Sequence, residues 1–322
     1  MAQEKRLEAK VIYRSNHSQL SLITIMDRAG IWDRLGIDVT RMDLKRDATE
    51  AENELIEGKC NVIFGCHITP HWRVANGIPL VCMAQAVNVA EDMLVSANPV
   101  HDLKELKGKT LAESKLVDDR GHLTSHPRGT HELYLRDAGI SSEMMDCQPP
   151  SKDADTIKLI LDGKADAGFV NATQEVACKR LGLHTKVMPI FPMVNSITLT
   201  TMVPYVEENS DLYLRVTKAL AQGIAFIRNE KEKTLEMLGG QVADRLGIKD
   251  NEELESYYGR LLNILNPSLC PDYDSLYNAY RIAEIVYPNL NDRGGNPVKL
   301  WDLHFVRKLE AEGFFKDLYP NQ

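Results

Sequence analysis

The sequence predicts an α/β protein of two lobes, with parallel-rich sheets, flanking helices and a cleft between the lobes. Short apolar segments bounded by glycine or polar residues alternate with helical segments through roughly the first two hundred residues, the pattern of parallel strands joined by crossover helices. The pattern restarts near residue 92, and after residue 203 the chain is almost entirely helical. A chain of 322 residues is long enough to bury two cores.

The order of these segments predicts that one lobe is inserted into the other. Strands are expected at 10–14, 38–44, 61–65, 79–86, 93–95, 110–112, 167–170, 186–190 and 197–203. Helices are expected at 18–35, 48–58, 70–76, 129–138, 154–161, 173–181, 212–228, 234–246, 251–265, 275–286 and 298–313. Lobe one is therefore predicted to contain residues 1–95 and 197–322, and lobe two residues 96–196.

The composition argues against several classes of protein. A net charge of −8 and a pI near 5.7, without a long basic run, disfavour nucleic-acid binding. The six cysteines form no CxxC pair, which favours free thiols in a reducing compartment, and the first fourteen residues lack an apolar segment with a cleavage site. No apolar run approaches the roughly 20 residues that span a bilayer. We therefore expect a cytoplasmic protein without membrane insertion, or a periplasmic one if a signal peptide has been removed.

Two polar turns give the strongest indication of a functional site. Each follows a predicted strand, and they are Ser15-Asn16-His17 and Gly65-Cys66-His67. Ligands of open parallel sheets lie beyond the carboxyl ends of the strands, so both turns are predicted to border one ligand site. A glycine at position 65 lets the backbone approach a ligand closely.

The histidine and cysteine side chains of these turns suit proton transfer. His17, at a predicted helix start, is expected to exchange a proton with a substrate, or else to cap the helix or contact the ligand without chemistry. Cys66 beside His67 is expected to have a lowered pKa and to act as nucleophile or acid, or else to be a small residue that fills space. His67 and His71 have the spacing of two metal ligands on a helix, although Pro70 predicts that the helix starts only there.

The segment before the predicted helix 129–138 is dense in hydrogen-bond donors. Pro127 suits the first turn of this helix, with Ser125 or His126 as its cap. Arg128 is predicted to hold a carboxylate or sulfonate through two parallel N–H bonds, and the alternative is a solvated charge at the helix start.

Two further features of lobe two have alternative interpretations. Asn171, at the end of a predicted strand, either caps the next helix or also contacts the ligand. Three histidines in the donor-rich segment could form a metal site, but no cysteine or carboxylate spacing supports it: His122, His126 and His131. We predict no metal site.

Five segments, in register along nearly the whole chain, resemble the type II periplasmic-binding-protein fold. They are residues 30–37, 55–62, 103–110, 161–167 and 205–209. The resemblance is to the branch of sulfonate-, nitrate- and taurine-binding proteins and thiamine-pyrimidine-synthase-like proteins. The layout is also similar to that of the aromatic sulfinate desulfinase, but His17 stands where that enzyme has its nucleophilic cysteine and Ile63 where it has its catalytic arginine. The run of adjacent cysteines typical of thiamine-pyrimidine synthase is absent from the sequence.

The preferred hypothesis is an enzyme that acts on a small anionic, aromatic acid. It is a lyase of the decarboxylase or desulfinase type, in which Arg128 and the Ser125 region hold the acid group and His17 or Cys66 transfers the proton. The chain has no glycine-rich phosphate loop, so we expect no cofactor. One alternative is a solute-binding protein of an ABC-type importer, or a ligand sensor, for a sulfonate or carboxylate. The other is a hydrolase using Cys66 or His17. The oligomeric state is left open.

Overall fold

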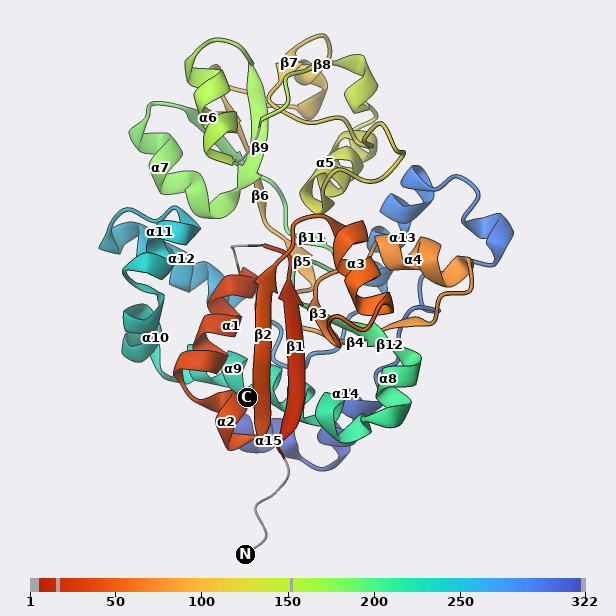
Figure 1. Cartoon of the computed structure of the whole chain (residues 1–322). Helices are drawn as coiled ribbons and strands as arrows, with labels where there is room; N and C mark the ends of the chain where they lie inside the picture. Colours follow the sequence, from red (N-terminus) through yellow and green to blue (C-terminus); the bar gives the residue numbers. More distant parts are fainter. Residues whose placement is uncertain (1–5, 16–17, 151–152, 320–322) are drawn as a thin grey trace, which may run out of the picture. The chain divides into compact units, whose positions relative to one another are not determined.

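The computed structural model describes residues 6–15, 18–150 and 153–319, which form two compact units (Figure 1). Unit 1 contains the described residues of Met1–Asn88, Pro192–Ala283 and Asn289–Gln322. Unit 2 contains those of Val89–Phe191 and Glu284–Pro288. The chain thus crosses between the units at 88/89 and 191/192. The sequence analysis predicted these boundaries a few residues later, at 95/96 and 196/197. The short segment 284–288, which was not predicted, also belongs to unit 2.

Unit 1 is built on a mixed sheet of five strands. Their order in the sheet is β2 (Ile37–Leu44), β1 (Leu7–Tyr13), β3 (Val62–Phe64), β12 (Thr198–Met202) and β4 (Leu80–Gln85). β1 runs parallel to β2 and β3, and β12 is antiparallel to both β3 and β4. Every residue of β3, β12 and β4 is buried, which is why β3 and most of β4 read as continuous apolar runs.

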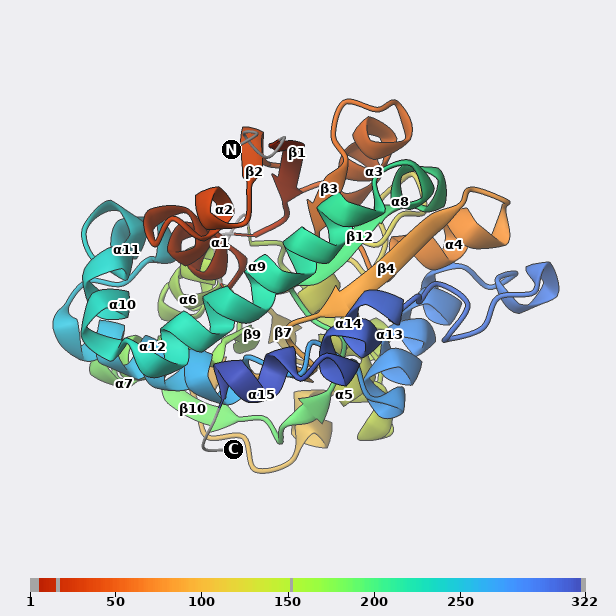
Figure 2. The ribbon, with the colours of Figure 1, turned by 90° about the horizontal axis from the view of Figure 1, so that it is seen from below.

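The helices of unit 1 pack on this sheet and on one another. They are α1 (Ser18–Arg28), α2 (Ile31–Arg34), α3 (Ala48–Ile56), α4 (Thr69–Ala75), α8 (Val203–Glu208), α9 (Ser210–Asn229), α10 (Lys231–Leu238), α11 (Gln241–Leu246), α12 (Asn251–Ile264), α13 (Tyr273–Val286), α14 (His304–Ala311) and α15 (Phe314–Leu318). The long helix α9 runs across unit 1 (Figure 2) and packs on α1. A Cβ at Gly223 of α9 would lie 2.8 Å from Leu22 Cδ1, so glycine permits this close contact.

Two predicted helices are divided in the structure. The expected helix 18–35 breaks at Gly30, whose φ of +65° is left-handed, and the expected helix 234–246 breaks at Gly240, with φ of +59°. These backbone conformations end a helix, and glycine adopts them without the penalty of a Cβ atom.

The free edge of β4 is covered by a segment that was predicted to be helical. Cys82 N donates to Leu300 O at 2.8 Å, and Asp302 N donates to Cys82 O at 2.9 Å. Trp301 therefore forms a parallel bridge with Cys82 at the edge of the sheet, and the helix that follows begins only at His304. Covering the edge satisfies backbone groups that could otherwise pair with another chain.

Leu300 holds this covering segment in the core, because its side chain is 1% exposed, whereas Val298 is 50% exposed. We predict that Leu300→Ala lowers the free energy of unfolding by about 2–4 kcal/mol, and that Val298→Ala changes it by less than about 0.5 kcal/mol. Urea unfolding followed by circular dichroism measures both. Equal effects of the two substitutions would contradict the proposed anchoring role.

Unit 2 contains a second mixed sheet of five strands. Their order is β10 (His184–Val187), β6 (Asp92–Ser96), β9 (Ala167–Asn171), β7 (Thr110–Leu111) and β8 (Asp146–Cys147). The helices of this unit are α5 (His126–Asp137), α6 (Asp153–Leu161) and α7 (Glu175–Arg180), with short 3₁₀ turns at Leu103–Leu106, Ser142–Met144 and Ala172–Gln174. A two-stranded pairing of β5 (Val89–Ala90) with β11 (Phe191–Pro192) lies where the chain crosses between the units.

The alternation of side chains along β6 gives unit 2 a core on each face of its sheet. Leu94 packs in one cluster with Phe169 of β9, while Met93 and Val95 pack in another with Val170. Successive strand residues point to opposite faces, so an uninterrupted apolar strand serves both cores.

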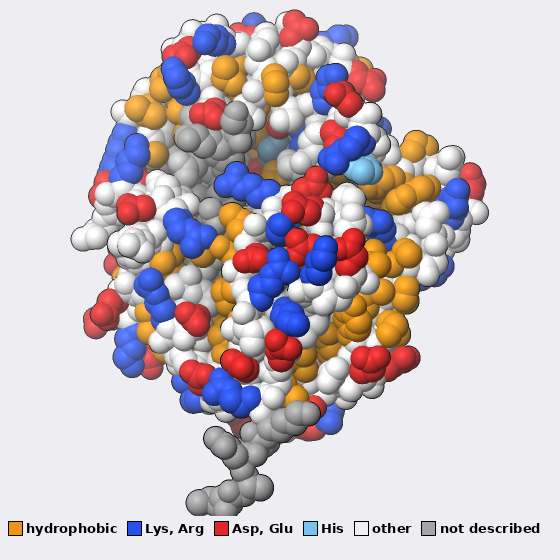
Figure 3. Space-filling model, in the orientation of Figure 1, with side chains coloured by type: hydrophobic (Ala, Val, Ile, Leu, Met, Phe, Trp, Pro, Cys, Tyr) orange, Lys and Arg blue, Asp and Glu red, His pale blue; other side chains and the backbone are white. Residues whose placement is uncertain are grey.

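The charged surface is mixed in sign. On the face shown in Figure 3, acidic and basic side chains lie among one another. One group of ion pairs joins Arg41 to Asp43 and Glu54 at 2.6 and 2.7 Å, and Lys45 to Glu50 and Glu54 at 2.5 and 3.0 Å. Among the described residues, no helix has the length and apolar character needed to cross a membrane.

Candidate functional site

The predicted turn after β1 is organised by a glutamine that the sequence analysis did not identify. Gln19 Oε1 accepts hydrogen bonds from the backbone N–H groups of Arg14 and Ser15, at 2.5 and 3.1 Å. Its Nε2 donates to Ser196 O at 2.6 Å, next to β12. Asn16 and His17 lie outside the described residues, so their predicted roles stay predictions.

Gly65 in the second predicted turn accommodates an arginine. Its φ is +124°, and a Cβ at this position would lie 2.5 Å from Arg14 Cγ. The glycine at position 65 is therefore explained by the close approach of Arg14, whereas the sequence analysis had explained it by the approach of a ligand.

Cys66 does not have the lowered pKa that was expected. The side chain is buried in the core of unit 1 with Ile12, Ala51 and Leu55. Burial raises the pKa of the thiol to about 12, and this effect outweighs the attraction of Arg14, whose Nη1 lies 3.4 Å from Sγ. The prediction of a thiolate nucleophile is wrong for this environment, and the structure supports the alternative of a small residue that fills space.

We predict that Cys66 is unreactive in the folded protein. Modification by iodoacetamide at pH 8 is expected to be at least about a hundredfold slower than in guanidinium chloride, because the thiol is both protonated and enclosed. Mass spectrometry of digests measures the rate for each cysteine. Cys147, which is only partly buried, is the internal control, and labelling of Cys66 as fast as Cys147 would contradict the prediction.

His67 and His71 do not lie on one helical face. α4 begins at Thr69, so His71 is helical and His67 is in the preceding turn. His71 packs edge-to-face on Tyr280 with 5.1 Å between ring centroids, and burial lowers its pKa to about 3. His67 Nδ1 lies 3.0 Å from Thr198 Oγ1. Within residues 6–15, 18–150 and 153–319, no group of three His, Cys, Asp or Glu side chains could hold a metal ion.

Backbone strain marks the same end of the sheet. The non-glycine residues with positive φ in the described chain are Cys66, Ser196 and Leu269, at 57°, 55° and 55°. Cys66 follows β3, Ser196 precedes β12, and Leu269 O accepts from the backbone N–H of Gln85 at the end of β4. Strained residues persist where surrounding contacts determine them and are common at ligand sites.

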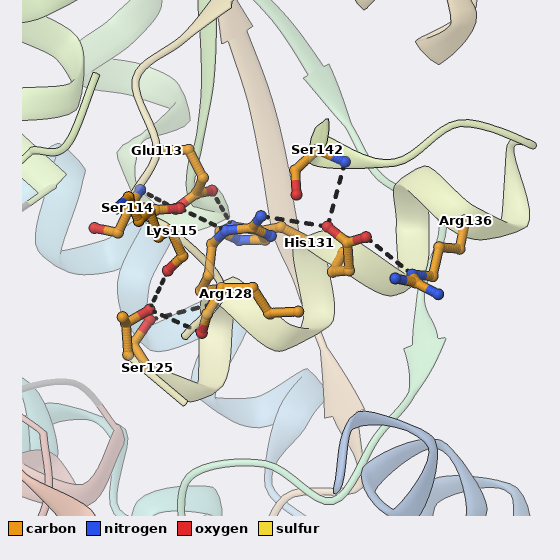
Figure 4. Close-up of polar contacts among 11 residues, drawn as sticks. Glu113, Ser114, Lys115, Ser125, Arg128, His131, Arg136 and Ser142 are labelled. Carbon is orange, nitrogen blue, oxygen red and sulfur yellow. Dashed lines mark hydrogen bonds and ion pairs between the residues drawn. The ribbon is translucent and has the colours of Figure 1, made fainter. Parts of the chain in front are cut away.

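In unit 2, α5 begins at His126, three residues before the predicted start at 129, and its cap is one of the two residues expected. Ser125 is the N-cap residue, and its Oγ accepts from Arg128 N at 3.2 Å, with Pro127 in the first turn. Figure 4 shows Ser125, Arg128 and His131 close to the 113–115 segment. His126 is partly buried beside the cap. Asn171 also acts as a cap, because its side-chain oxygen accepts from Thr173 N at 3.0 Å.

Arg128 is not a solvated charge, because its side chain is only 1% exposed. Its Nε donates to Ser114 O at 2.8 Å and its Nη2 to Glu132 Oε2 at 3.2 Å (Figure 4). Among the described residues, Nη1 has no hydrogen-bond partner. A buried N–H group without an acceptor is unusual in a folded protein and calls for a functional explanation.

Glu132 is shared by two arginines. Besides Arg128, it accepts from Arg136 Nε at 2.9 Å and from Ser142 N at 3.4 Å. Burial raises the pKa of this carboxyl, but the hydrogen bonds from Ser142 and Arg136 and the attraction of Arg128 together outweigh it, so the pKa is lowered. Glu132 is thus a carboxylate, and it holds the Arg128 guanidinium in place from one side.

His131 lies one turn along α5, between two carboxylates that the sequence analysis missed. Its Nδ1 is 2.6 Å from Glu113 Oε2, its Nε2 is 3.8 Å from Asp92 Oδ1, and its ring stacks on Phe169 at 4.5 Å. Burial lowers the pKa of His131, but the two carboxylates outweigh burial and raise it to about 9. His131 is therefore an imidazolium at neutral pH.

The raised pKa of His131 predicts a pH-dependent stability. Because the folded-state pKa is above the unfolded value of about 6.5, the stabilisation is complete below pH 6.5 and is lost as the pH rises through about 9. Its size is about 3 kcal/mol at most. Urea unfolding between pH 6 and 10 is expected to show this decline in the native protein.

The His131→Gln variant is expected to lose this decline, and His184→Gln, which changes an exposed histidine on β10, is expected to keep it. Parallel stability curves for the native protein and His131→Gln would contradict the assignment.

The chain was compared with protein-family models, curated proteins and solved structures. The model of the NMT1/THI5-like family matches residues 26–234. Among curated proteins, none matches the chain in sequence.

Solved structures with a similar fold cover nearly the whole chain. The periplasmic aliphatic sulphonate-binding protein SsuA from Escherichia coli is 17% identical with a TM-score of 0.68, over 92% of this chain and 96% of that one. The periplasmic nitrate-binding protein NrtA from Synechocystis PCC 6803 is 11% identical with a TM-score of 0.69, over 98% and 92%. A mutant of DszB in complex with biphenyl-2-sulfinic acid is 14% identical with a TM-score of 0.63, over 95% and 99%. The predicted periplasmic-binding-protein fold is confirmed.

Proposed function

The chain belongs to the NMT1/THI5-like family, and we propose that it is a solute-binding protein for a small organic anion. Two of the similar structures, SsuA and NrtA, are described as binding proteins for a sulphonate and for nitrate, and DszB is in complex with a sulfinic acid. All three of these ligands are oxyanions. The proposal therefore adopts the alternative of the sequence analysis in place of its preferred enzyme.

The observation that carries the proposal is the enclosed guanidinium of Arg128. Its Nε and Nη2 are engaged by Ser114 O and Glu132, while Nη1 has no acceptor among the residues that the structure describes. An oxyanion is the natural acceptor for a fixed guanidinium N–H, because such a charge-assisted hydrogen bond is roughly twice as strong as a neutral one.

The charges around Arg128 decide how it would select a ligand. Arg128, Arg136 and the His131 imidazolium are balanced by Glu132, Glu113 and Asp92. With no excess positive charge, recognition depends on the direction of the Nη1–H group and not on a general attraction for anions. This arrangement favours a site that is selective for the shape of the oxyanion.

The lyase hypothesis receives less support than solute binding. Its thiol candidate, Cys66, is protonated and lies in the core of unit 1. The same facts weaken a hydrolase that uses Cys66 as nucleophile. A role of His17 in chemistry stays a prediction, since that residue is outside the described part of the chain.

The proposed function favours a periplasmic location. SsuA and NrtA are both described as periplasmic, which supports the periplasmic alternative and not the cytoplasmic expectation. The particular anion, whether sulfonate, carboxylate, sulfinate or nitrate, is left to a binding screen.

The test is to remove the Arg128 guanidinium. We predict that Arg128→Gln weakens binding of the best anion from a panel of ethanesulfonate, nitrate, benzoate and benzenesulfinate by about 10- to 100-fold, measured by isothermal titration calorimetry. The matched control is Arg136→Gln, which also removes a partner of Glu132. Because the Arg136 side chain is partly exposed, this substitution is expected to change the affinity by less than about threefold.

The folded state of each variant is checked by its melting temperature. If a folded Arg128→Gln variant binds the anion as tightly as the native protein, or if no anion of the panel binds the native protein, the proposal is wrong.

A further inference from the structure

Two side chains near the start of α5 are attached to one short segment after β7. Arg128 Nε donates to Ser114 O at 2.8 Å, and His131 Nδ1 lies 2.6 Å from Glu113 Oε2 (Figure 4). Residues 128 and 131 are three positions apart and are therefore neighbours on the helix surface, and residues 113 and 114 are adjacent in the chain. The helix and the segment are thus bonded at two neighbouring points.

The carboxylate of Glu113 links these two attachments. Its Oε1 accepts from the backbone N–H of Ser114 at 3.3 Å, and its Oε2 faces the imidazole. A continuous path of contacts therefore runs from His131 through Glu113 and the backbone of Ser114 to Arg128 Nε. Because Glu113, Arg128 and His131 are all buried, no freely rotating side chain interrupts this path.

The imidazole itself is held from the sheet of unit 2. Its ring stacks on Phe169 of β9 with 4.5 Å between the ring centroids, and His131 is 5% exposed. A ring confined in this way restrains the carboxylate that it contacts. The Glu113–His131 pair is therefore placed to restrain the backbone at Ser114, whose carbonyl sets the direction of the Arg128 guanidinium.

We propose that Glu113 and His131 are positioning residues of the Arg128 site, because together they hold Ser114 O where it directs the guanidinium toward the bound oxyanion. The inference rests on the proposed function, since it takes Arg128 as the residue that binds the anion. All residues of the path belong to unit 2, and neither positioning residue needs to touch the solute. A guanidinium that is held in its binding orientation beforehand binds more tightly, because less conformational freedom is lost on binding.

The groups that face His131 link this positioning to pH. Glu113 and Asp92 of β6 are the charged groups on neighbouring elements, with Asp92 Oδ1 3.8 Å from Nε2, and the Phe169 ring faces it from β9. The titratable side chains within one turn on α5 itself are Arg128, Glu132 and Tyr134. A charge-assisted hydrogen bond is roughly twice as strong as a neutral one, so the imidazolium holds Glu113 more firmly than the neutral ring does. The restraint on Ser114 O is therefore expected to weaken as the pH rises through the pKa of His131, about 9.

The first test measures the Arg128 Nε–H group directly. Its protection against hydrogen exchange, relative to free arginine at the same pH, is measured by NMR on ¹⁵N-labelled protein at pH 7, and its signal is assigned by its loss in Arg128→Gln. His131→Gln and Glu113→Gln are expected to lower this protection about tenfold. His184→Gln, which changes an exposed histidine of the same unit, is expected to change it by less than about twofold.

Backbone amides of β9 in the same spectra separate positioning from general stability. Exchange through opening of the whole unit lowers the protection of these buried amides as much as that of Arg128 Nε–H. A loss that is larger at Arg128 supports positioning. Equal losses at both places, or unchanged protection of Arg128 in the folded variants, overturn the proposal.

The second test is the affinity for the best anion of the panel, measured by calorimetry. Glu113→Gln, which keeps the length of the side chain and removes its charge, is expected to weaken binding about fivefold to tenfold at pH 7. The matched control is Glu143→Gln, which removes an exposed carboxylate of the same unit and is expected to change the affinity by less than about twofold.

The pH profile of the affinity tests the role of the imidazolium. Between pH 7 and pH 10 the native protein is expected to lose about threefold more affinity than His131→Gln, because only the native protein loses the imidazolium. Asp92→Asn removes one of the two carboxylates that stabilise the imidazolium, so in this variant the loss is expected at a lower pH. Identical profiles of the native protein and His131→Gln overturn the role assigned to His131.

The outcomes distinguish the inference from the proposed function. If binding depends on Arg128 but not on Glu113 or His131, the inference is wrong and the proposed function stands. If no anion binds the native protein, the proposed function fails, and the exchange of Arg128 Nε–H still decides whether the pair positions the guanidinium. If neither Glu113→Gln nor His131→Gln folds, the native protein decides: the protection of Nε–H is expected to fall about threefold more than that of the β9 amides between pH 7 and pH 10, and an equal change at both overturns the proposal.

Discussion

The burial of the Arg128 guanidinium is the constraint on which the organisation of unit 2 depends. A buried cation is tolerated only with charged and hydrogen-bonding partners, and here Glu132 and Ser114 O supply them. Glu132 must in turn be kept ionised, which Arg136 and Ser142 N accomplish. The start of α5, the segment after β7 and the turn at residue 142 are thereby tied to a single side chain (Figure 4). A protein that required only stability could fill this volume with apolar residues at no loss, so the retention of a buried arginine favours recognition of a ligand.

The two units stabilise their buried polar groups in different ways. Unit 2 pairs full charges, whereas the end of the unit 1 sheet uses neutral side chains, Gln19, Gln85 and Thr198, which join backbone groups to one another. Neutral links of this kind satisfy buried backbone groups without the large desolvation cost of an ion.

The fold was largely predictable from the sequence, because strand and helix patterns are local. β3 and β4 could be recognised as buried apolar runs, and Ser125 as one of two candidate caps of α5 because Pro127 suits the first helical turn. The breaks at Gly30 and Gly240 were missed because glycine also occurs inside helices, and its left-handed φ cannot be read from the sequence. The segment 298–303 was assigned to a helix because its pairing with β4 joins residues more than two hundred positions apart.

Most of the site could not be predicted because its contacts also join residues that lie far apart in the sequence. The raised pKa of Cys66 comes from burial by residues of other elements, and the partners of His67 and His131 lie on separate strands.

The central place of β12 in the unit 1 sheet constrains how the protein can be synthesised. β3 and β4 are nearest in sequence, yet β12 lies between them in the sheet, and it follows β4 by more than a hundred residues. On the ribosome, the four earlier strands of unit 1 therefore emerge before β12, which pairs with both β3 and β4. Their sheet cannot be completed until unit 2 up to residue 191 has been made. Unit 2 itself receives its last segment, 284–288, later still. Neither unit can complete its folding when the nascent chain first passes through it, so both expose partly formed sheets until the later segments have been made.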